Sequence, residues 1–151
     1  MTTRADIEQE IVSRASAWLT SAGLAVTFAG SNADLNAPLG WAIRAAGGTV
    51  AAPSLVTSTD VQTVAAADLD FLMDLAELRT LQNILASYAL VDAKAGPVEA
   101  KSSQLADRIE RRISQLRGWL SAAYGYGGSG AFSVHLTRTD GYTDLQAELD
   151  A

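Results

Sequence analysis

The residues in this chain that could do chemistry are few, and the first is its single histidine, His135. A hydrolase triad needs a nucleophile and a carboxylate around a histidine, and the chain has no G-x-S-x-G nucleophile motif. It also has no cysteine, which excludes thiol catalysis, disulfides and cysteine-ligated metals. We therefore expect no catalytic residue, no metal site and no cofactor, and the chain is predicted not to be an enzyme.

A group of carboxylates is the second candidate. Asp70, Asp74 and Glu77 recur at i, i+4 and i+7, which places them on one face of a helix, and Asp68 precedes them. Paired carboxylates can hold a hard cation or share a proton. However, negative charge is favoured in the first turns of any helix, and no histidine is near in the sequence. We interpret the set as a solvated helix face or as a contact for basic side chains.

The third candidate is the glycine-rich segment 125–130. A phosphate-binding loop precedes a helix and carries a lysine, whereas this segment follows a helical pattern and has none, so it is interpreted as a flexible tether. Residues 131–138 then alternate as a short strand, with Phe132, Val134 and Leu136 on one side. Because a lone strand cannot satisfy its own backbone groups, it needs a sheet in its own domain or on a neighbour.

Aromatic residues cluster around this tether and strand: Tyr124, Tyr126, Phe132 and Tyr142. Aromatic rings can stack on bases, but the residues after 117 hold one basic and four acidic side chains, which disfavours nucleic acid. Aromatic residues are also enriched at the cores of protein interfaces. The partner-binding residues predicted for this C-terminal arm are Tyr126, Phe132, Val134 and Leu136.

Charge is unevenly distributed along the 151 residues, whose net charge is −6. Such a balance gives no overall basic footprint for nucleic acid or an anionic membrane. Residues 94–117 nevertheless hold six basic and three acidic side chains, whereas residues 1–93 hold four basic and ten acidic. The basic segment is either a solvated helix face or a surface complementary to another copy. The residues predicted to make the inter-subunit contacts are Arg108, Arg111, Arg112 and Arg117.

Repeating apolar positions predict the elements that must position these residues. The predicted helices span 4–22, 37–46, 60–64, 68–90 and 98–123, with a short strand at 24–28. Thr3 and Asp6 resemble a capping box before the first helix. Asn36 is the expected cap of the second helix, and Ser58 or Thr59 that of the third.

The two longest patterns differ in their apolar surface. In the helix at 68–90, apolar residues cover more than half of the circumference, so it is either central in a bundle or buries a second face on another subunit. The helix at 98–123 has one apolar stripe: Leu105, Ile109, Ile113, Leu116, Leu120 and Ala123. Because only a short break at Gly96-Pro97 separates them, the two helices should form an antiparallel hairpin.

These patterns predict a mainly α fold: a small helical bundle with a long antiparallel helical hairpin and a C-terminal extended β arm. The expected division is a helical domain at 1–124 and a glycine-tethered arm and tail at 125–151. No apolar run approaches the ~20 residues of a membrane span, so no membrane partner is expected.

Three segments resemble the neck adaptors, or head–tail connectors, of tailed bacteriophages. They are DLDFLMDLAELRTLQNIL at 68–85, Gly96-Pro97, and SQLADRIERRI at 103–113, within a region of about 58–124. The resemblance implies a structural virion protein, assembled in the host cytoplasm, that is not an enzyme. It further implies a homo-oligomeric ring of about twelve copies that joins the portal protein to a tail-side neck protein. DNA would at most pass through the ring, without specific nucleic-acid binding. The alternative is a cytoplasmic helical homodimer that acts as a regulator or protein-binding module.

Overall fold

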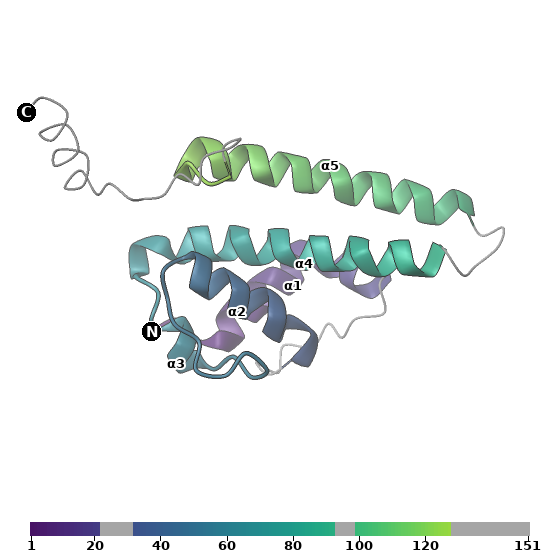
Figure 1. Ribbon diagram of the computed structural model, residues 1–151. Coiled ribbons are helices and arrows are strands. Elements are labelled where there is room, and N and C mark those ends of the chain that lie inside the picture. The colour runs from purple at the N-terminus through teal and green to yellow at the C-terminus, as the bar shows by residue number, and fades with distance from the viewer. Residues whose placement is uncertain (22–31, 93–98, 128–151) are drawn as a thin grey trace, which may run out of the picture. The chain divides into compact units, whose positions relative to one another are not determined.

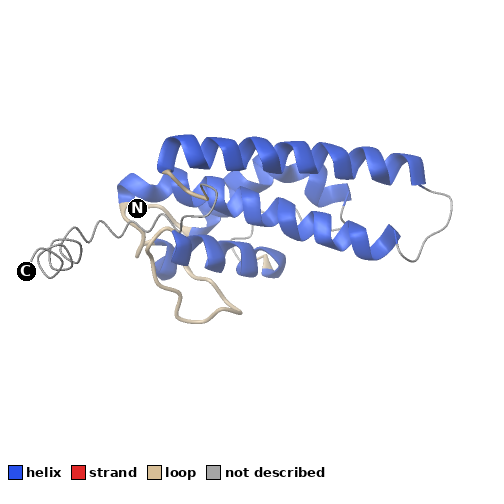
Figure 2. Ribbon diagram, turned by 45° about the horizontal axis from the view of Figure 1, so that its top comes forward, coloured by secondary structure: helices blue, strands red, loops and turns tan. Residues whose placement is uncertain are grey.

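The computed structural model describes residues 1–21, 32–92 and 99–127. All regular elements in these ranges are helical, and Figure 2 shows no strand among them. They are α1 (Arg4–Ser21), a 3₁₀ turn (Ala33–Leu35), α2 (Asn36–Ala45), α3 (Ser58–Val61), a second 3₁₀ turn (Ala66–Asp68), α4 (Leu69–Asp92) and α5 (Glu99–Tyr124). The mainly α prediction is therefore confirmed. The strands expected at 24–28 and 131–138 lie outside the described residues.

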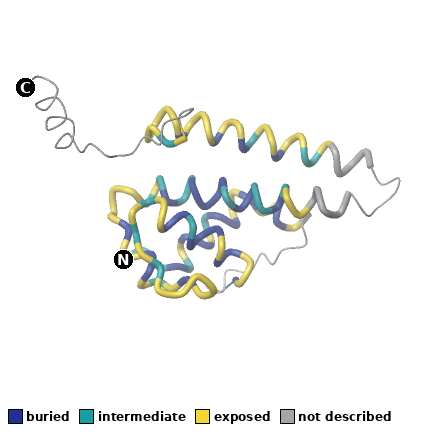
Figure 3. Tube along the Cα trace, viewed as in Figure 1, coloured by how far each residue is buried: buried dark blue, intermediate teal, exposed yellow. Residues whose placement is uncertain are grey.

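Contacts along the backbone divide the chain into two units, Met1–Leu116 and Arg117–Ala151. In the first unit, α4 contacts both α1 and α2, as Figure 1 shows. Figure 3 shows many buried residues on these three helices, and most of them are apolar. The largest of them are Ile7, Ile11, Leu19, Leu39, Ile43, Leu72, Leu75, Leu81 and Ile84. Burial of such side chains is the main favourable contribution to folding.

Helix α4 is buried around most of its circumference. Leu72, Leu75 and Leu81 are 0% exposed, and Leu78 is 3% exposed. At about 100° per residue, these four positions span half of a turn, and Ile84, also fully buried, widens the arc. Because the single chain already covers these side chains, α4 is the central helix of its own unit, which was the first of the two alternatives.

The first helix begins at the predicted capping box. The backbone N–H and the hydroxyl of Thr3 each donate to Asp6 Oδ2 over 2.7 Å, and the Asp6 N–H donates back to Thr3 Oγ1 over 3.3 Å. The bond from the Thr3 amide, followed by that from its hydroxyl, lowers the pKa of the Asp6 carboxyl. The prediction that Thr3 and Asp6 cap α1 is confirmed.

A second capping box precedes α3, but one residue earlier than expected. Thr57 is the cap, and its side chain and that of Asp60 satisfy each other's backbone N–H. The choice of Ser58 or Thr59 was wrong, because only Thr57 lies three residues before an acidic residue that can complete the box.

Helix α5 carries the predicted apolar stripe and ends where the pattern ends. Ile109, Ile113, Leu116 and Leu120 are buried, whereas Leu105 is half-buried and Ala123 exposed. After Tyr124, Gly125 adopts a φ of 66°, a left-handed conformation that suits glycine at the end of a helix. Its N–H donates to the Ser121 carbonyl over 3.0 Å, which closes the last turn.

Candidate functional site

The acidic side chains in the first half of α4 and just before it have two kinds of surroundings: some are exposed to solvent, and one forms an ion pair inside the protein. Asp68 and Asp70 are exposed, but Glu77 is 1% exposed. Arg112 of α5 reaches Glu77 Oε1 with its Nε and its Nη2, each at 2.8 Å. The other carboxylate oxygen, Oε2, accepts no hydrogen bond from the described residues, and Arg14 Nη1 lies 3.6 Å from it.

Arg14 of α1 extends this cluster. Its Nη1 donates to Asp74 Oδ1 over 2.9 Å, and its Nε donates to Glu10 Oε1 over 2.7 Å. Burial works against the charge of Arg14, but the bonds to Glu10 and Asp74 outweigh it and raise the pKa of the guanidinium. Side chains from α1, α4 and α5 thus meet at Glu77. The prediction that these carboxylates contact basic side chains is confirmed for Asp74 and Glu77.

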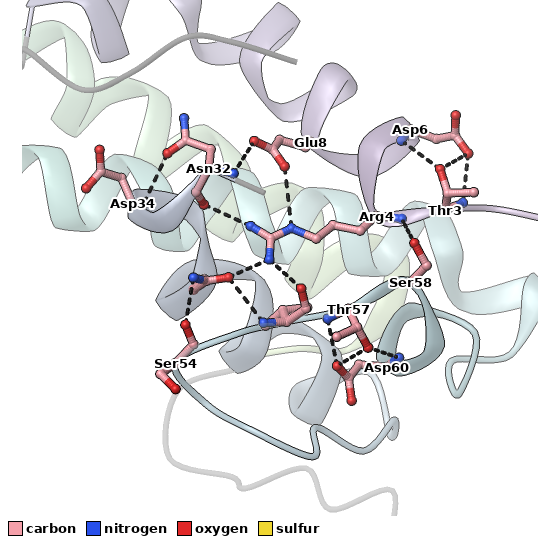
Figure 4. Close-up of polar contacts among 12 residues, drawn as sticks. Thr3, Arg4, Asp6, Glu8, Asn32, Asp34, Ser54, Thr57, Ser58 and Asp60 are labelled. Carbon is pink, nitrogen blue, oxygen red and sulfur yellow. Dashed lines mark hydrogen bonds and ion pairs between the residues drawn. The ribbon is translucent and has the colours of Figure 1, made fainter. Parts of the chain in front are cut away.

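A second polar cluster is centred on Arg4 and was not predicted from the sequence (Figure 4). Arg4 is 2% exposed and Glu8 is 0% exposed. The guanidinium donates to Glu8 Oε2 over 3.4 Å, to the Asn32 carbonyl over 2.8 Å, to Asn36 Oδ1 over 2.5 Å and to the Val56 carbonyl. Glu8 Oε1 accepts the Asn32 N–H over 3.0 Å. The planar fork of arginine therefore satisfies four acceptors from four segments of the chain.

Asn36 belongs to this Arg4 cluster and does not cap α2, so that prediction is wrong. The chain enters α2 directly from the 3₁₀ turn, which Asn32 caps, and Asn36 is the first residue inside the helix. Its carboxamide instead holds the segment before α3. Asn36 Oδ1 accepts the Val56 N–H over 3.1 Å, and Nδ2 donates to the Ser54 carbonyl over 2.8 Å.

Residues 46–57, which connect α2 with α3, contain no charged side chain, and we call them the neutral loop. Gly48 fixes its beginning. A Cβ at this position would lie 2.7 Å from side-chain atoms of Thr63 and Val64 and 2.8 Å from Ile43, so only glycine allows this approach. The Thr49 N–H donates to Thr63 Oγ1 over 2.8 Å, which ties the loop to the residues after α3.

Asp60 holds the middle of the neutral loop. Its Oδ1 accepts the Ala51 N–H over 2.9 Å, and its Oδ2 accepts the Thr57 N–H over 2.7 Å. The Ala51 amide, then the Thr57 amide and hydroxyl, lower the pKa of the Asp60 carboxyl. Although the loop is anchored at several points, Leu55 near its end is 54% exposed. The loop is thus held in one conformation and exposes one large apolar side chain, that of Leu55.

The four arginines predicted at a subunit contact have different surroundings. Arg108, Arg111 and Arg117 are exposed, whereas Arg112 is bound to Glu77 within the chain. Arg111 shares a shallow surface depression with three other residues of α5: Asp107, Glu110 and Ser114. Acidic neighbours therefore offset part of the positive charge on this helix, and the inter-subunit role of the four residues stays a prediction.

The residues predicted in the C-terminal arm are described only at its beginning. Tyr126 is half-buried, and its N–H donates to the Leu120 carbonyl over 3.1 Å. Phe132, Val134 and Leu136 lie outside the described residues. Just before the arm, Trp119 of α5 is 56% exposed, which is unusual for so large an apolar side chain.

The part of the chain that the structure describes lacks two kinds of site. It contains no group of three or more His, Cys, Asp or Glu side chains that could hold a metal ion. None of its helices has the length and apolar character that crossing a membrane requires. Comparison of the chain with protein-family models, with curated proteins and with solved structures gave no match.

Proposed function

We propose that this chain is a structural adaptor that assembles into a ring in the head–tail connector of a tailed bacteriophage and joins the portal protein to tail components. The observation that supports assembly most directly is the exposed surface of α5. Trp119 is 56% exposed there, and Arg108, Arg111 and Arg117 are exposed on the same helix. Tryptophan and arginine are the residue types most enriched in the energetic centres of protein interfaces.

Two further parts of the proposal concern architecture. The helices α4 and α5 form the long antiparallel hairpin, which would stand in the wall of the ring. Residues 125–151 form an extended β arm that adds a strand to a neighbouring subunit or to the portal. In that arm, Tyr126, Phe132, Val134 and Leu136 provide the apolar contacts.

The charge distribution is consistent with contact between copies. The first 93 residues hold ten acidic and four basic side chains, whereas α5 exposes three arginines. Arg108 and Arg111 are three residues apart and so lie on neighbouring positions of one helix face. Arg112 is paired internally with the buried Glu77, so it contributes less to an outer contact. Individual surface ion pairs are worth only ~0–1 kcal/mol, so several must act together.

A charge-reversal experiment tests the proposed assembly. Light scattering measures the mass of the chain alone and after mixing with a purified portal ring. We expect the Arg108→Glu/Arg111→Glu variant to assemble less, and we expect assembly of the parent chain to weaken as salt rises. Arg44→Glu, a single reversal at an exposed position of α2, is compared with Arg108→Glu alone and with Arg111→Glu alone, because each of these changes the net charge by the same amount. Equal masses for the parent chain and the double variant at all salt concentrations contradict an electrostatic contact through α5.

A cytoplasmic helical homodimer is the second candidate. It is favoured by the first unit, Met1–Leu116, which buries its own core and needs no ring to cover α4. In that case the mass should equal two copies over a wide range of concentration, and portal protein should not change it. A larger mass, or a complex with portal, removes this alternative.

A further inference from the structure

Two arginines of the first unit have no acidic partner in the part of the chain that the structure describes. Residues 1–93 contain four basic side chains, and two of them, Arg4 and Arg14, form ion pairs. The other two, Arg44 and Arg79, form none with the described residues. Each is the one charged residue of a long stretch of sequence, 35–59 for Arg44 and 78–91 for Arg79. Their positive charges are therefore not neutralised by neighbouring residues in the sequence.

Both arginines lie beside Trp41, which is half-buried on α2. The central guanidinium carbon of Arg79, on α4, is 5.6 Å from the centroid of the Trp41 ring, within the range of a cation–π contact. Arg44 follows Trp41 by three residues and so lies next to it on the surface of α2. Two helices thus bring one aromatic ring and two positive charges together. We call this group, with Gln82, the Trp41 surface.

The Trp41 surface has hydrogen-bond donors to spare. Arg79 Nη1 donates to Gln82 Oε1 over 3.4 Å, which uses one of the five N–H groups of the guanidinium. A guanidinium that contacts a ring with its face keeps the N–H groups at its edge available for a carboxylate. The Arg44 side chain forms no hydrogen bond with the described residues. Unused arginine donors beside a tryptophan suit a peptide that carries carboxylates.

We propose that the Trp41 surface binds the acidic tail of the same chain, residues 139–151. This tail lies outside the described residues, and its sequence contains no basic side chain. Its acidic residues are Asp140, Asp144, Glu148 and Asp150. The charges of the two parts are complementary, and Tyr142, Leu145 and Leu149 give the tail apolar groups to place against Trp41.

The chain itself favours its own tail as the occupant. Its other run of acidic residues without a basic one, at 60–77, belongs to the described fold, where Asp60, Asp74 and Glu77 already have partners. The tail is also tethered. Twelve residues separate Gly127 from Asp140 and span up to about 40 Å when extended, whereas a domain the size of the first unit has a radius of gyration of about 13 Å. Such a tether keeps the tail at roughly millimolar local concentration, above that of a free acidic partner.

The absence of cysteine allows a direct test by disulfide cross-linking in the full chain. One variant carries Ala45→Cys, exposed beside Arg44, together with Ala147→Cys in the tail. Another carries Gln9→Cys, exposed on α1, with the same tail cysteine. A disulfide requires Cα atoms within about 7 Å, so its rate of formation under mild oxidation reports how often the tail visits each surface. We expect the Ala45 pair to close about tenfold faster, because a few weak ion pairs acting together have about this effect.

Neutral variants identify the charges responsible. Arg44→Gln/Arg79→Gln should slow closure of the Ala45 pair to the rate of the Gln9 pair, and Arg44→Gln alone, at an exposed position, should have an intermediate effect. Arg108→Gln/Arg111→Gln is the matched control, because it removes the same charge from exposed positions of α5 and should leave the rate unchanged. Circular dichroism checks that each variant is folded.

The outcomes separate this inference from the proposed ring. Equal rates for the two cysteine pairs, or no slowing by Arg44→Gln/Arg79→Gln, overturn the tail contact. Disulfides that form mainly between chains, and that become fewer on dilution, overturn it in favour of a tail supplied by another copy. Because the proposed contact lies within one chain, Arg44→Glu should not lower the mass of an assembly. A ring that forms without faster closure of the Ala45 pair leaves the proposed function intact and removes this inference alone.

Discussion

Replacement of Arg4 by methionine should remove a large part of the stability of the first unit. Methionine keeps a long unbranched side chain but loses the charge, so Glu8, which is 0% exposed, stays buried without its cation. The carbonyls of Asn32 and Val56 also lose a donor. Removal of one partner of a buried ion pair costs about 3–5 kcal/mol. Domains of this size have a total stability of about 5–15 kcal/mol.

Related variants should follow a definite order. Glu8→Leu should cost about 1–3 kcal/mol, less than Arg4→Met, because Arg4 keeps three neutral oxygen acceptors. The double variant Arg4→Met/Glu8→Leu leaves no buried charge, so it should be more stable than Arg4→Met alone. Arg4→Lys is the control for charge alone, because one ammonium group cannot reach all four acceptors that the guanidinium binds. The stability of Arg4→Lys should therefore lie between that of the parent and that of Arg4→Met.

The assay is urea unfolding at neutral pH, followed by the helical circular dichroism signal and fitted with a common slope. The reasoning is refuted if Arg4→Met costs less than about 1 kcal/mol, the usual effect of an arbitrary substitution. It is also refuted if Glu8→Leu is the more damaging change, or if the double variant is less stable than Arg4→Met. Either result would mean that the buried charge of Glu8 is not what Arg4 compensates.

Three other outcomes can be measured in the same way. Gly48→Ala should destabilise by about 1–3 kcal/mol because its methyl group meets three side chains, whereas Gly118→Ala, with open space, should stabilise α5 by up to about 1 kcal/mol. Folding lowers the pKa of the Asp60 carboxyl below its ordinary value of 3.8. The ionised carboxylate therefore stabilises the folded protein fully at pH values above 3.8, and this contribution is lost as the pH falls through the lower pKa of the folded state. The stability difference between the parent and Asp60→Asn should therefore be full at neutral pH and shrink in acid, and a constant difference would contradict this. Arg112→Met should lower the free energy of unfolding by about 2 kcal/mol, because the buried Glu77 carboxylate loses its hydrogen-bond donor. Arg111→Met, at an exposed position of the same helix, should change the stability little. Equal effects of the two replacements would show that the internal pair is not stabilising.

Helices and caps could largely be predicted from the sequence because their causes are local. Apolar residues at helical spacing placed α4 and α5 within two residues of their observed bounds. The T-x-x-D pattern predicts the cap at Thr3, and the same pattern at Thr57 and Asp60 is the signal for the cap of α3. The prediction of Asn36 as a cap failed because the preceding residues form a 3₁₀ turn that runs into α2.

The polar clusters could not be predicted, because their partners come from distant parts of the chain. Arg4 and Glu8 have the i, i+4 spacing of an ordinary surface ion pair. What buries them is the arrival of Asn32, Asn36 and Val56, whose bonds span 24 to 52 residues of sequence. Similarly, nothing local distinguished Arg112 from the neighbouring arginines of α5. Only its position beside Glu77 gives it an internal partner.

The Arg4 cluster has a consequence for the way this protein opens. Loops usually exchange their amide hydrogens with solvent far faster than helices do. Here the end of the neutral loop is bonded to the first turn of α1 and the start of α2 through one guanidinium and one carboxamide. The Val56 amide should then exchange no faster than the α1 amides, because a single opening event must break all of these bonds. A connecting segment of this fold would thus behave, in hydrogen exchange, as part of its slowest cooperative unit.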